Sequence, residues 1–151
     1  MNVLSLHRSP GGIPKAEVAE ARVDGRGIDG DDWAHPKYHG GPDQALLLIG
    51  AEVLEELSGL GFSLFPGALG ENVTTTGLDY RELSAGCRLS LGEEVQIELT
   101  KLREPCRTLD VYNTARAGRI QKHLKTLGRG GWYARVLNGG TLRKGDRIGL
   151  A

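Results

Sequence analysis

Apolar and polar residues alternate along several short stretches of the chain, which is the pattern of β-strands with one buried face. The clearest stretch places Val95, Ile97 and Leu99 on one side. Residues 3–6 and 17–23 predict two further strands. The uninterrupted apolar run at residues 45–49 predicts a strand that is buried on both faces.

Two stretches have the spacing of amphipathic helices instead. Residues 51–57 place apolar side chains on one side, and residues 115–127 do the same with Ile120, Leu124 and Leu127. Short strands separated by turns, with only two helices, predict a mainly β fold, a closed or partly open β-barrel with a few short helices. The length of 151 residues predicts a single domain over residues 1–151.

The composition indicates how the elements are connected and in which compartment the domain is expected. Twenty-three glycines indicate many tight turns between short elements. Two cysteines are too few for a disulfide framework, so we expect a reducing compartment, with Cys87 as a packed thiol in an alternating stretch. The run at residues 45–49 is too short to cross a membrane, and the first eight residues are too polar for a signal peptide. We therefore expect a cytoplasmic protein with no membrane partner.

The formal net charge of zero conceals an uneven distribution. Residues 1–100 contain 7 Lys and Arg against 16 Asp and Glu, whereas residues 101–151 contain 12 against 3. This asymmetry predicts an anionic partner for the carboxy-terminal part, either a phosphate-bearing small molecule, a nucleic acid or an acidic protein surface. The alternative is that the two parts neutralise each other within the fold. Nucleic acid is the less favoured partner, because only Tyr112, Trp132 and Tyr133 could offer stacking faces.

Cys106 is the strongest candidate for chemistry. It follows Pro105, which stiffens the bend after the strand at residues 95–102, and its neighbours include Lys101, Arg103 and Arg107. Nearby cations favour the thiolate, which is the form that attacks electrophiles or binds a soft metal. The alternative is that Cys106 is a small buried hydrophobic residue.

Three glycine-rich segments also contain polar residues. His35, Lys37 and His39 precede a Gly-Gly-Pro turn just before the predicted strand at residues 45–49, which makes that turn a candidate site, although Pro36 disfavours a helical histidine pair for metal. Gly70-Glu71-Asn72 forms a polar trio, and Arg129 lies among glycines, where it could reach an anion. The acidic, glycine-rich residues 24–32 lack calcium-loop spacing and are expected to form a solvated loop.

The order of these motifs resembles the MOSC family, the domains found at the carboxy terminus of molybdenum cofactor sulfurases and as small stand-alone bacterial proteins. The resemblance rests on the segments at residues 39–45, 70–72, 89–93, 103–106, 129–137, 139–140 and 145–148. It runs from about the first predicted strand to the end of the chain. In this family a cysteine in an Arg-x-Pro-Cys setting, which Arg103 to Cys106 matches, carries sulfur as a persulfide or ligates molybdenum.

The resemblance implies a β-rich barrel, molybdenum cofactor (molybdopterin) as the anionic pterin ligand, and Cys106 as the catalytic thiol and metal ligand. Pyridoxal phosphate binding is a further function associated with such domains. The candidate cofactor contacts are Lys37, His39, Asn72, Arg103, Arg129 and Arg135. Two functions stay open, reduction of N-hydroxylated compounds and metal-free sulfur transport as a persulfide. Each needs a separate partner protein, an electron-donating reductase or a cysteine desulfurase.

Overall fold

A computed structural model describes residues 1–32, 41–126 and 128–151 of the chain. Most of the regular structure is β. In the described residues, eight strands form one sheet in the order β11-β7-β8-β9-β5-β6-β1-β2, and three form a second sheet in the order β10-β3-β4. All neighbouring strands are antiparallel except β5 and β6, which are parallel.

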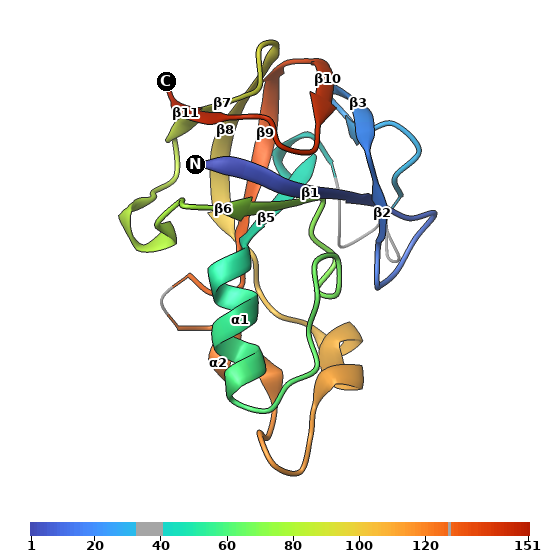
Figure 1. The fold of residues 1–151 in the computed structure, drawn as a ribbon, viewed down its shortest axis with the longest axis vertical. Helices are drawn as coiled ribbons and strands as arrows, with labels where there is room; N and C mark the ends of the chain where they lie inside the picture. The colour runs from blue at the N-terminus through green and yellow to red at the C-terminus, as the bar shows by residue number, and fades with distance from the viewer. Residues whose placement is uncertain (33–40, 127) are drawn as a thin grey trace.

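The strands of the large sheet are β1 (Asn2–Arg8), β2 (Ala16–Val18), β5 (Leu46–Gly50), β6 (Val73–Thr76), β7 (Arg88–Leu91), β8 (Val95–Leu102), β9 (Trp132–Asn138) and β11 (Ile148–Leu150). The small sheet contains β3 (Glu20–Asp24), β4 (Gly27–Ile28) and β10 (Gly140–Arg143). The helices are α1 (Ala51–Gly59) and α2 (Ile120–Leu124), with short 3-10 turns η1 (Pro42–Gln44), η2 (Tyr80–Glu82) and η3 (Arg107–Tyr112). Figure 1 shows α1 and α2 at one end of the molecule, beyond the strands.

The mainly β prediction with few short helices is confirmed, but the barrel is not. In the described part of the chain neither sheet closes on itself through a continuous set of paired strands. Strand β1, next to the edge strand β2, is nevertheless joined locally to the segment before β11 at the other edge. The backbone N–H of Val3 donates to the carbonyl of Asp146 at 2.8 Å, and that of Gly145 donates to the carbonyl of Val3 at 2.7 Å. A single bridge between Asn2 and Arg147 continues this contact.

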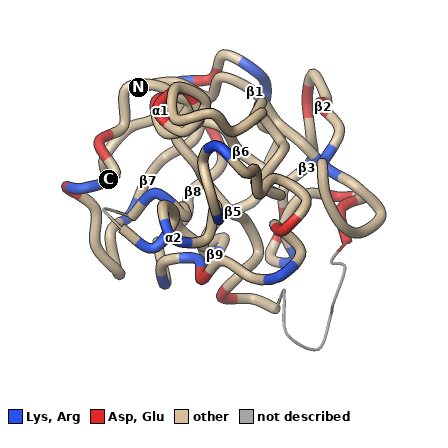
Figure 2. The backbone as a smooth tube through the Cα atoms, turned by 90° about the horizontal axis from the view of Figure 1, so that it is seen from below, with Lys and Arg blue, Asp and Glu red and all other residues tan. Residues whose placement is uncertain are grey.

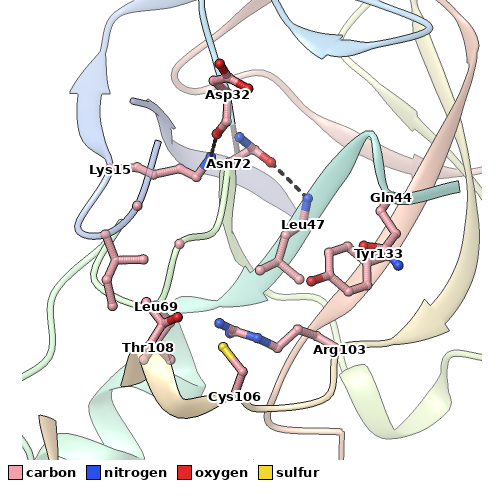
Figure 3. Close-up of a pocket in the computed structure, with 13 residues that line it drawn as sticks. Lys15, Asp32, Gln44, Leu47, Leu69, Asn72, Arg103, Cys106, Thr108 and Tyr133 are labelled. Atoms are coloured by element: carbon pink, nitrogen blue, oxygen red, sulfur yellow. Dashed lines mark hydrogen bonds between the residues drawn. The ribbon is translucent and has the colours of Figure 1, made fainter. Parts of the chain in front are cut away.

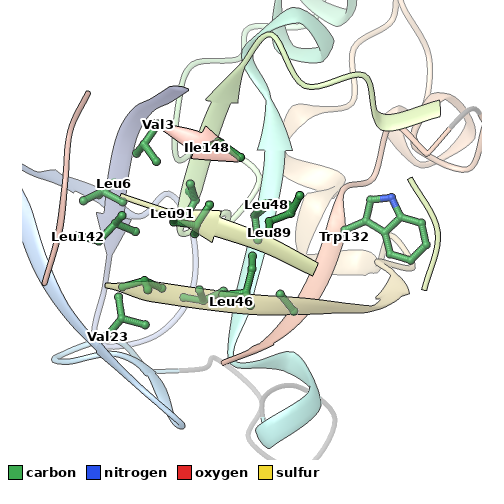
Figure 4. Packing of buried hydrophobic residues seen from close by; sticks show 14 of the residues in the cluster. Val3, Leu6, Val23, Leu46, Leu48, Leu89, Leu91, Trp132, Leu142 and Ile148 are labelled. Atoms are coloured by element: carbon green, nitrogen blue, oxygen red, sulfur yellow. The ribbon is translucent and has the colours of Figure 1, made fainter. Parts of the chain in front are cut away.

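Strand β5 explains why residues 45–49 are apolar without alternation. Leu46 and Leu48 point into the main hydrophobic cluster, which both sheets share (Figure 4). Leu47 and Ile49, on the opposite face, pack in a second cluster with residues of α1, η3 and α2. The strand is therefore buried on both sides, as its composition predicts, and it separates the sheet core from the helical end.

The second helix is shorter in the structure than the apolar spacing of the sequence predicts. The sequence predicts a helix over residues 115–127, whereas α2 includes only Ile120–Leu124. Gly118 has a φ of 83° and forms an isolated bridge with Thr114, so the chain turns there instead of continuing a helix. The side chain of Asn113 then accepts from the backbone N–H of Ile120 at 2.8 Å, at the first residue of α2. No helix in residues 1–32, 41–126 or 128–151 is long and apolar enough to cross a membrane.

Candidate functional site

Cys106 is held at the junction between β8 and η3. Its backbone is extended, with φ −120° and ψ 178°, and η3 begins at the next residue. The side-chain amide of Gln121, on α2, donates to the Cys106 carbonyl at 3.1 Å. Another bond joins the same Gln121 amide to a carboxylate oxygen of Asp110 at 2.7 Å. The thiol is half-buried and free, so it is positioned by its backbone and still accessible.

The thiol opens into a pocket between the sheet and the helical end. The pocket is lined by Gly12, Ile13, Lys15, Asp32, Gln44, Leu47, Leu69, Gly70, Asn72, Arg103, Cys106, Thr108 and Tyr133. Figure 3 shows the Arg103 guanidinium beside the Cys106 sulfur, with Leu69 and Thr108 on one side and Tyr133 on the other. Residues from both ends of the chain therefore meet around one sulfur atom.

Arg103 is a buried cation without an ion pair among the described residues. Only 9% of the residue is exposed, and its Nη1 is buried with no hydrogen-bond partner there. Its backbone N–H donates to the carbonyl of Gly131 at 2.9 Å, which anchors the residue between β8 and β9. Burial lowers the pKa of the guanidinium, and Tyr133, Cys106 and Glu71 oppose that shift. An unsatisfied cation that faces a pocket favours an anionic ligand.

The opposite wall of the pocket is built by a buried polar network. Lys15 Nζ contacts both carboxylate oxygens of Asp31, at 2.6 and 2.7 Å, and both side chains are less than 10% exposed, at 8% and 6%. Asn72 donates to Asp31 at 2.9 Å, and its Oδ1 accepts from the backbone N–H of Leu47 at 3.0 Å. The expectation of a solvated loop at residues 24–32 is therefore wrong at Asp31, which pairs with a lysine inside the fold.

Glu71 is a buried acid behind the pocket. Its carboxylate accepts from the backbone N–H of Leu69 at 3.2 Å and from the hydroxyl of Thr74 at 3.1 Å. Burial raises its pKa to about 7, and backbone hydrogen bonds from Glu71 and Gly67, the Thr74 hydroxyl and the nearby Arg103 oppose the shift. His7, also fully buried, has a pKa lowered by burial and stays neutral. The polar trio predicted at residues 70–72 therefore lies inside the fold and borders the pocket.

Tyr133 of β9 supplies a protonated hydroxyl at the pocket wall. Burial raises its pKa, Arg103 opposes this shift and Cys106 adds to it. The phenol therefore stays neutral at physiological pH and can donate a hydrogen bond. The residues around Tyr133 in the sequence do not indicate this role, because the pairing of β8 with β9 is what places Tyr133 at the pocket.

Cys106 also lines a second hollow. It is lined by Gln44, Lys101, Leu102, Glu104, Pro105, Cys106 and Tyr133. Gln44, Cys106 and Tyr133 belong to both hollows, so the thiol lies where the two adjoin.

The structure brings some of the predicted cofactor contacts together and separates others. Arg103, Asn72 and Cys106 line one pocket, although the Asn72 side chain is already engaged by Leu47 and Asp31. Lys37 and His39 lie outside the described residues.

Arg129 and Arg135 lie away from this pocket. Arg129 pairs with Glu56, and Arg135 pairs with Asp43 at 2.8 Å and with Glu98 at 3.0 Å. Neither lines the pocket of Cys106. Their assignment as cofactor contacts stays a prediction.

Sequence reasoning missed Lys15, Asp31 and Tyr133. The only local signal was the glycine-rich character of residues 11–12 and 25–30, which is compatible with close backbone approach but does not identify a partner. In the described residues, no group of three or more His, Cys, Asp and Glu side chains could hold a metal ion.

Three comparisons relate the chain to known proteins. The family model described as "MOSC domain" matches residues 35–149. A protein named "Reductase" from Gibberella moniliformis is 38% identical over 85 residues, which cover 56% of this chain and 15% of that protein. Protein YiiM from Escherichia coli K12 is 31% identical over 141 residues, which cover 85% of this chain and 60% of that protein.

The structure of YiiM from Geobacillus stearothermophilus has the same fold. It superimposes with a TM-score of 0.78 at 23% sequence identity, covering 99% of this chain and 74% of that one. The chain therefore shares its fold with a longer protein, and it spans 60% or less of the two sequence relatives just described.

Proposed function

Because the chain belongs to the MOSC domain family, we propose that it binds a molybdenum cofactor, with Cys106 as the thiol ligand of molybdenum and Arg103 as a contact for the anionic pterin. The observation that carries this proposal is that a half-buried free thiol, Cys106, and a buried guanidinium, Arg103, line the same pocket. A soft thiolate suits molybdenum, and a cation with an unused donor suits a phosphate-bearing group.

The residues present fit such a group. The unpartnered Nη1 of Arg103 needs an acceptor, and Gly70 and Gly12 leave the pocket edge free of side chains. Tyr133 can donate a hydrogen bond from a neutral hydroxyl. The Lys15 ammonium, by contrast, is already neutralised by Asp31, so Arg103 supplies the free positive charge.

When bound, the cofactor supplies a metal centre that can accept oxygen from an N-hydroxylated compound, with two electrons and two protons provided by a separate reductase. The chain's own residues have simpler tasks. Cys106 holds the metal, Arg103 orients the anion, and the hollow beyond Cys106 gives a substrate access from solvent. The two free thiols Cys87 and Cys106 suit a reducing compartment, so the proposed location is the cytoplasm.

The proposal does not extend to pyridoxal phosphate. That cofactor is held as a Schiff base by a lysine whose amine is free to react. Lys15, the lysine in the described part of the pocket, is instead held by both oxygens of Asp31.

The test is the metal content of the protein purified from a host that makes molybdenum cofactor. We expect molybdenum in the wild type, a decrease of about tenfold or more in Cys106→Ser, and little change in Cys87→Ser. Cys87 is the matched control because it is also a half-buried free thiol, but it packs against the main hydrophobic cluster. Inductively coupled plasma mass spectrometry gives the readout.

Equal molybdenum in wild type and Cys106→Ser would contradict the proposal. A wild type without molybdenum that gains a persulfide at Cys106 from a cysteine desulfurase and labelled cysteine would favour the second candidate function. In that reaction the Cys106 thiolate attacks the outer sulfur of the desulfurase persulfide and the desulfurase thiolate leaves. The half-buried, accessible sulfur of Cys106 is what favours this alternative.

A further inference from the structure

The helical end next to Cys106 carries an excess of positive charge. Residues 101–128 contain seven Lys and Arg against two Asp and Glu. Five of these cations are exposed on η3, on α2, in the turn between them and at the residue that caps the end of α2. We call them the basic face: Arg107, Arg116, Arg119, Lys122 and Lys125. Figure 2, which views the molecule from this end, shows Lys and Arg segments gathered around α2.

The basic face is not neutralised by its own fold. Among the residues described, only Arg119 of this face forms an ion pair, with Asp110 at a long 3.8 Å. Several arginines elsewhere do form close ion pairs, since Arg81, Arg88, Arg129 and Arg135 each pair with a carboxylate. The hypothesis that the two oppositely charged parts of the chain simply neutralise each other therefore fails at this end.

The basic face is fixed relative to the thiol. Gln121, in the middle of α2, is buried, and its side-chain amide donates to the Cys106 carbonyl. The apolar side of α2, with Ile120 and Leu124, packs in the cluster that also contains Leu47 of the pocket wall. Arg107 of this face directly follows Cys106, and Cys106 lines the second hollow together with Lys101 and the exposed Leu102.

We propose that the basic face is the docking surface for an acidic protein that delivers electrons to the site at Cys106. This inference rests on the proposed function, which requires an external electron donor. Charge complementarity argues for an acidic partner, because exposed unpaired cations attract an opposite surface and speed its association. Nucleic acid fits less well, since Trp132 is buried, Tyr133 lines the pocket and the hydroxyl of Tyr112 bonds to the Ala68 carbonyl.

The test measures binding of a purified flavodoxin, an acidic flavin protein, to the immobilised full chain by biolayer interferometry. The variant Lys122→Glu/Lys125→Glu reverses two charges of the basic face. The control Arg22→Glu/Arg26→Glu makes the same change in net charge at two exposed positions near the small sheet. We expect about a tenfold loss of affinity in the first variant, a change below about threefold in the control, and weaker binding as salt rises from about 20 to about 200 mM.

Three results would overturn the inference: no binding of flavodoxin to the wild type at low salt, equal losses in the two variants, or tighter binding of a single-stranded oligonucleotide of about 20 nucleotides than of flavodoxin. Molybdenum content is measured on the same samples. The binding assay does not depend on the metal, so the two proposals can fail separately. A protein that contains no molybdenum but still binds flavodoxin through α2 would contradict the proposed function and support the docking surface.

Discussion

At the scale of single residues, the site combines an accessible sulfur with a cation that the fold leaves unsatisfied. A buried Arg103 with an unpaired Nη1 destabilises the folded state, because its charge loses hydration and gains no counterion among the described residues. In the proposed function, an anionic ligand beside Cys106 would offset this cost.

Replacing Arg103 separates its effect on stability from its proposed effect on ligand binding. In Arg103→Met the buried charge is removed and the side-chain volume is largely kept, so we expect a free energy of unfolding that is unchanged or higher by about 1 kcal/mol. Molybdenum content should fall by about tenfold or more. Urea unfolding and metal analysis provide the measurements.

Arg88→Met is the control for this change. Its guanidinium is exposed and paired with Glu98, so both quantities should stay close to those of the wild type, with stability within about 0.5 kcal/mol. If Arg103→Met were strongly destabilised and kept its molybdenum, the residue would be structural.

At the scale of elements, the pocket depends on how the ends of β8 and β9 are fixed. Gly131 precedes β9 with a φ of 90°, and its carbonyl accepts the backbone N–H of Arg103. A β-carbon at this position would press on the carbonyl of Leu48 and the side chain of Ile49. The glycine therefore sets both the strand junction and the direction of the arginine.

Gly131→Ala should consequently lower the free energy of unfolding by about 2 kcal/mol or more, since alanine is strained at positive φ and has no space there. Gly25→Ala is the comparison, because its β-carbon would meet nothing within 4 Å, and its effect should stay within about 0.5 kcal/mol. Thermal and urea unfolding of the three proteins tests this. Equal stabilities would show that the strand ends are not held at Gly131.

Element predictions from the sequence succeeded where the hydrophobic pattern is local. β8 and β5 lie where alternation and the apolar run predict strands, and α1 begins at Ala51 as expected. The prediction for residues 115–127 failed because apolar spacing continues through Gly118, whose positive φ breaks the helix. The spacing of apolar residues does not reveal which backbone dihedral angle a glycine will adopt.

At the scale of the whole molecule, the site is assembled by contacts between residues far apart in the chain. Cys106 and Arg103 could be predicted because they lie close together in the sequence. The opposite wall could not, because Lys15 pairs with Asp31 across 16 residues and Asn72 bonds to Asp31 across 41. The pairing of β1 with β2 and β6, together with the hydrogen bond from the backbone N–H of Asp32 to the Ser9 carbonyl, brings these side chains together.

The buried acid Glu71 makes the stability of the whole molecule depend on pH. Its carboxyl loses a proton near pH 4.5 when unfolded but only near pH 7 in the folded protein, so stability decreases as pH rises between these values. In Glu71→Gln this contribution is absent. We expect the stability of the variant relative to wild type to increase by about 3 kcal/mol between pH 4 and pH 8.

Urea unfolding of both proteins across this pH range gives the difference. The buried His7, whose lowered pKa acts in the opposite direction, is present in both proteins and cancels in the comparison. A difference that does not vary with pH would mean that the carboxyl of Glu71 titrates as it does in water.

The contribution of the first β-strands to the pocket has a practical consequence for how such domains are divided. The family model starts at residue 35, whereas Gly12, Lys15 and Asp32 line the pocket and Asp31 fixes both Lys15 and Asn72. A fragment or fusion protein trimmed to the family boundaries would keep Cys106 and Arg103 but would lack one wall of the pocket. Expression fragments and grafted domains should therefore begin upstream of β1.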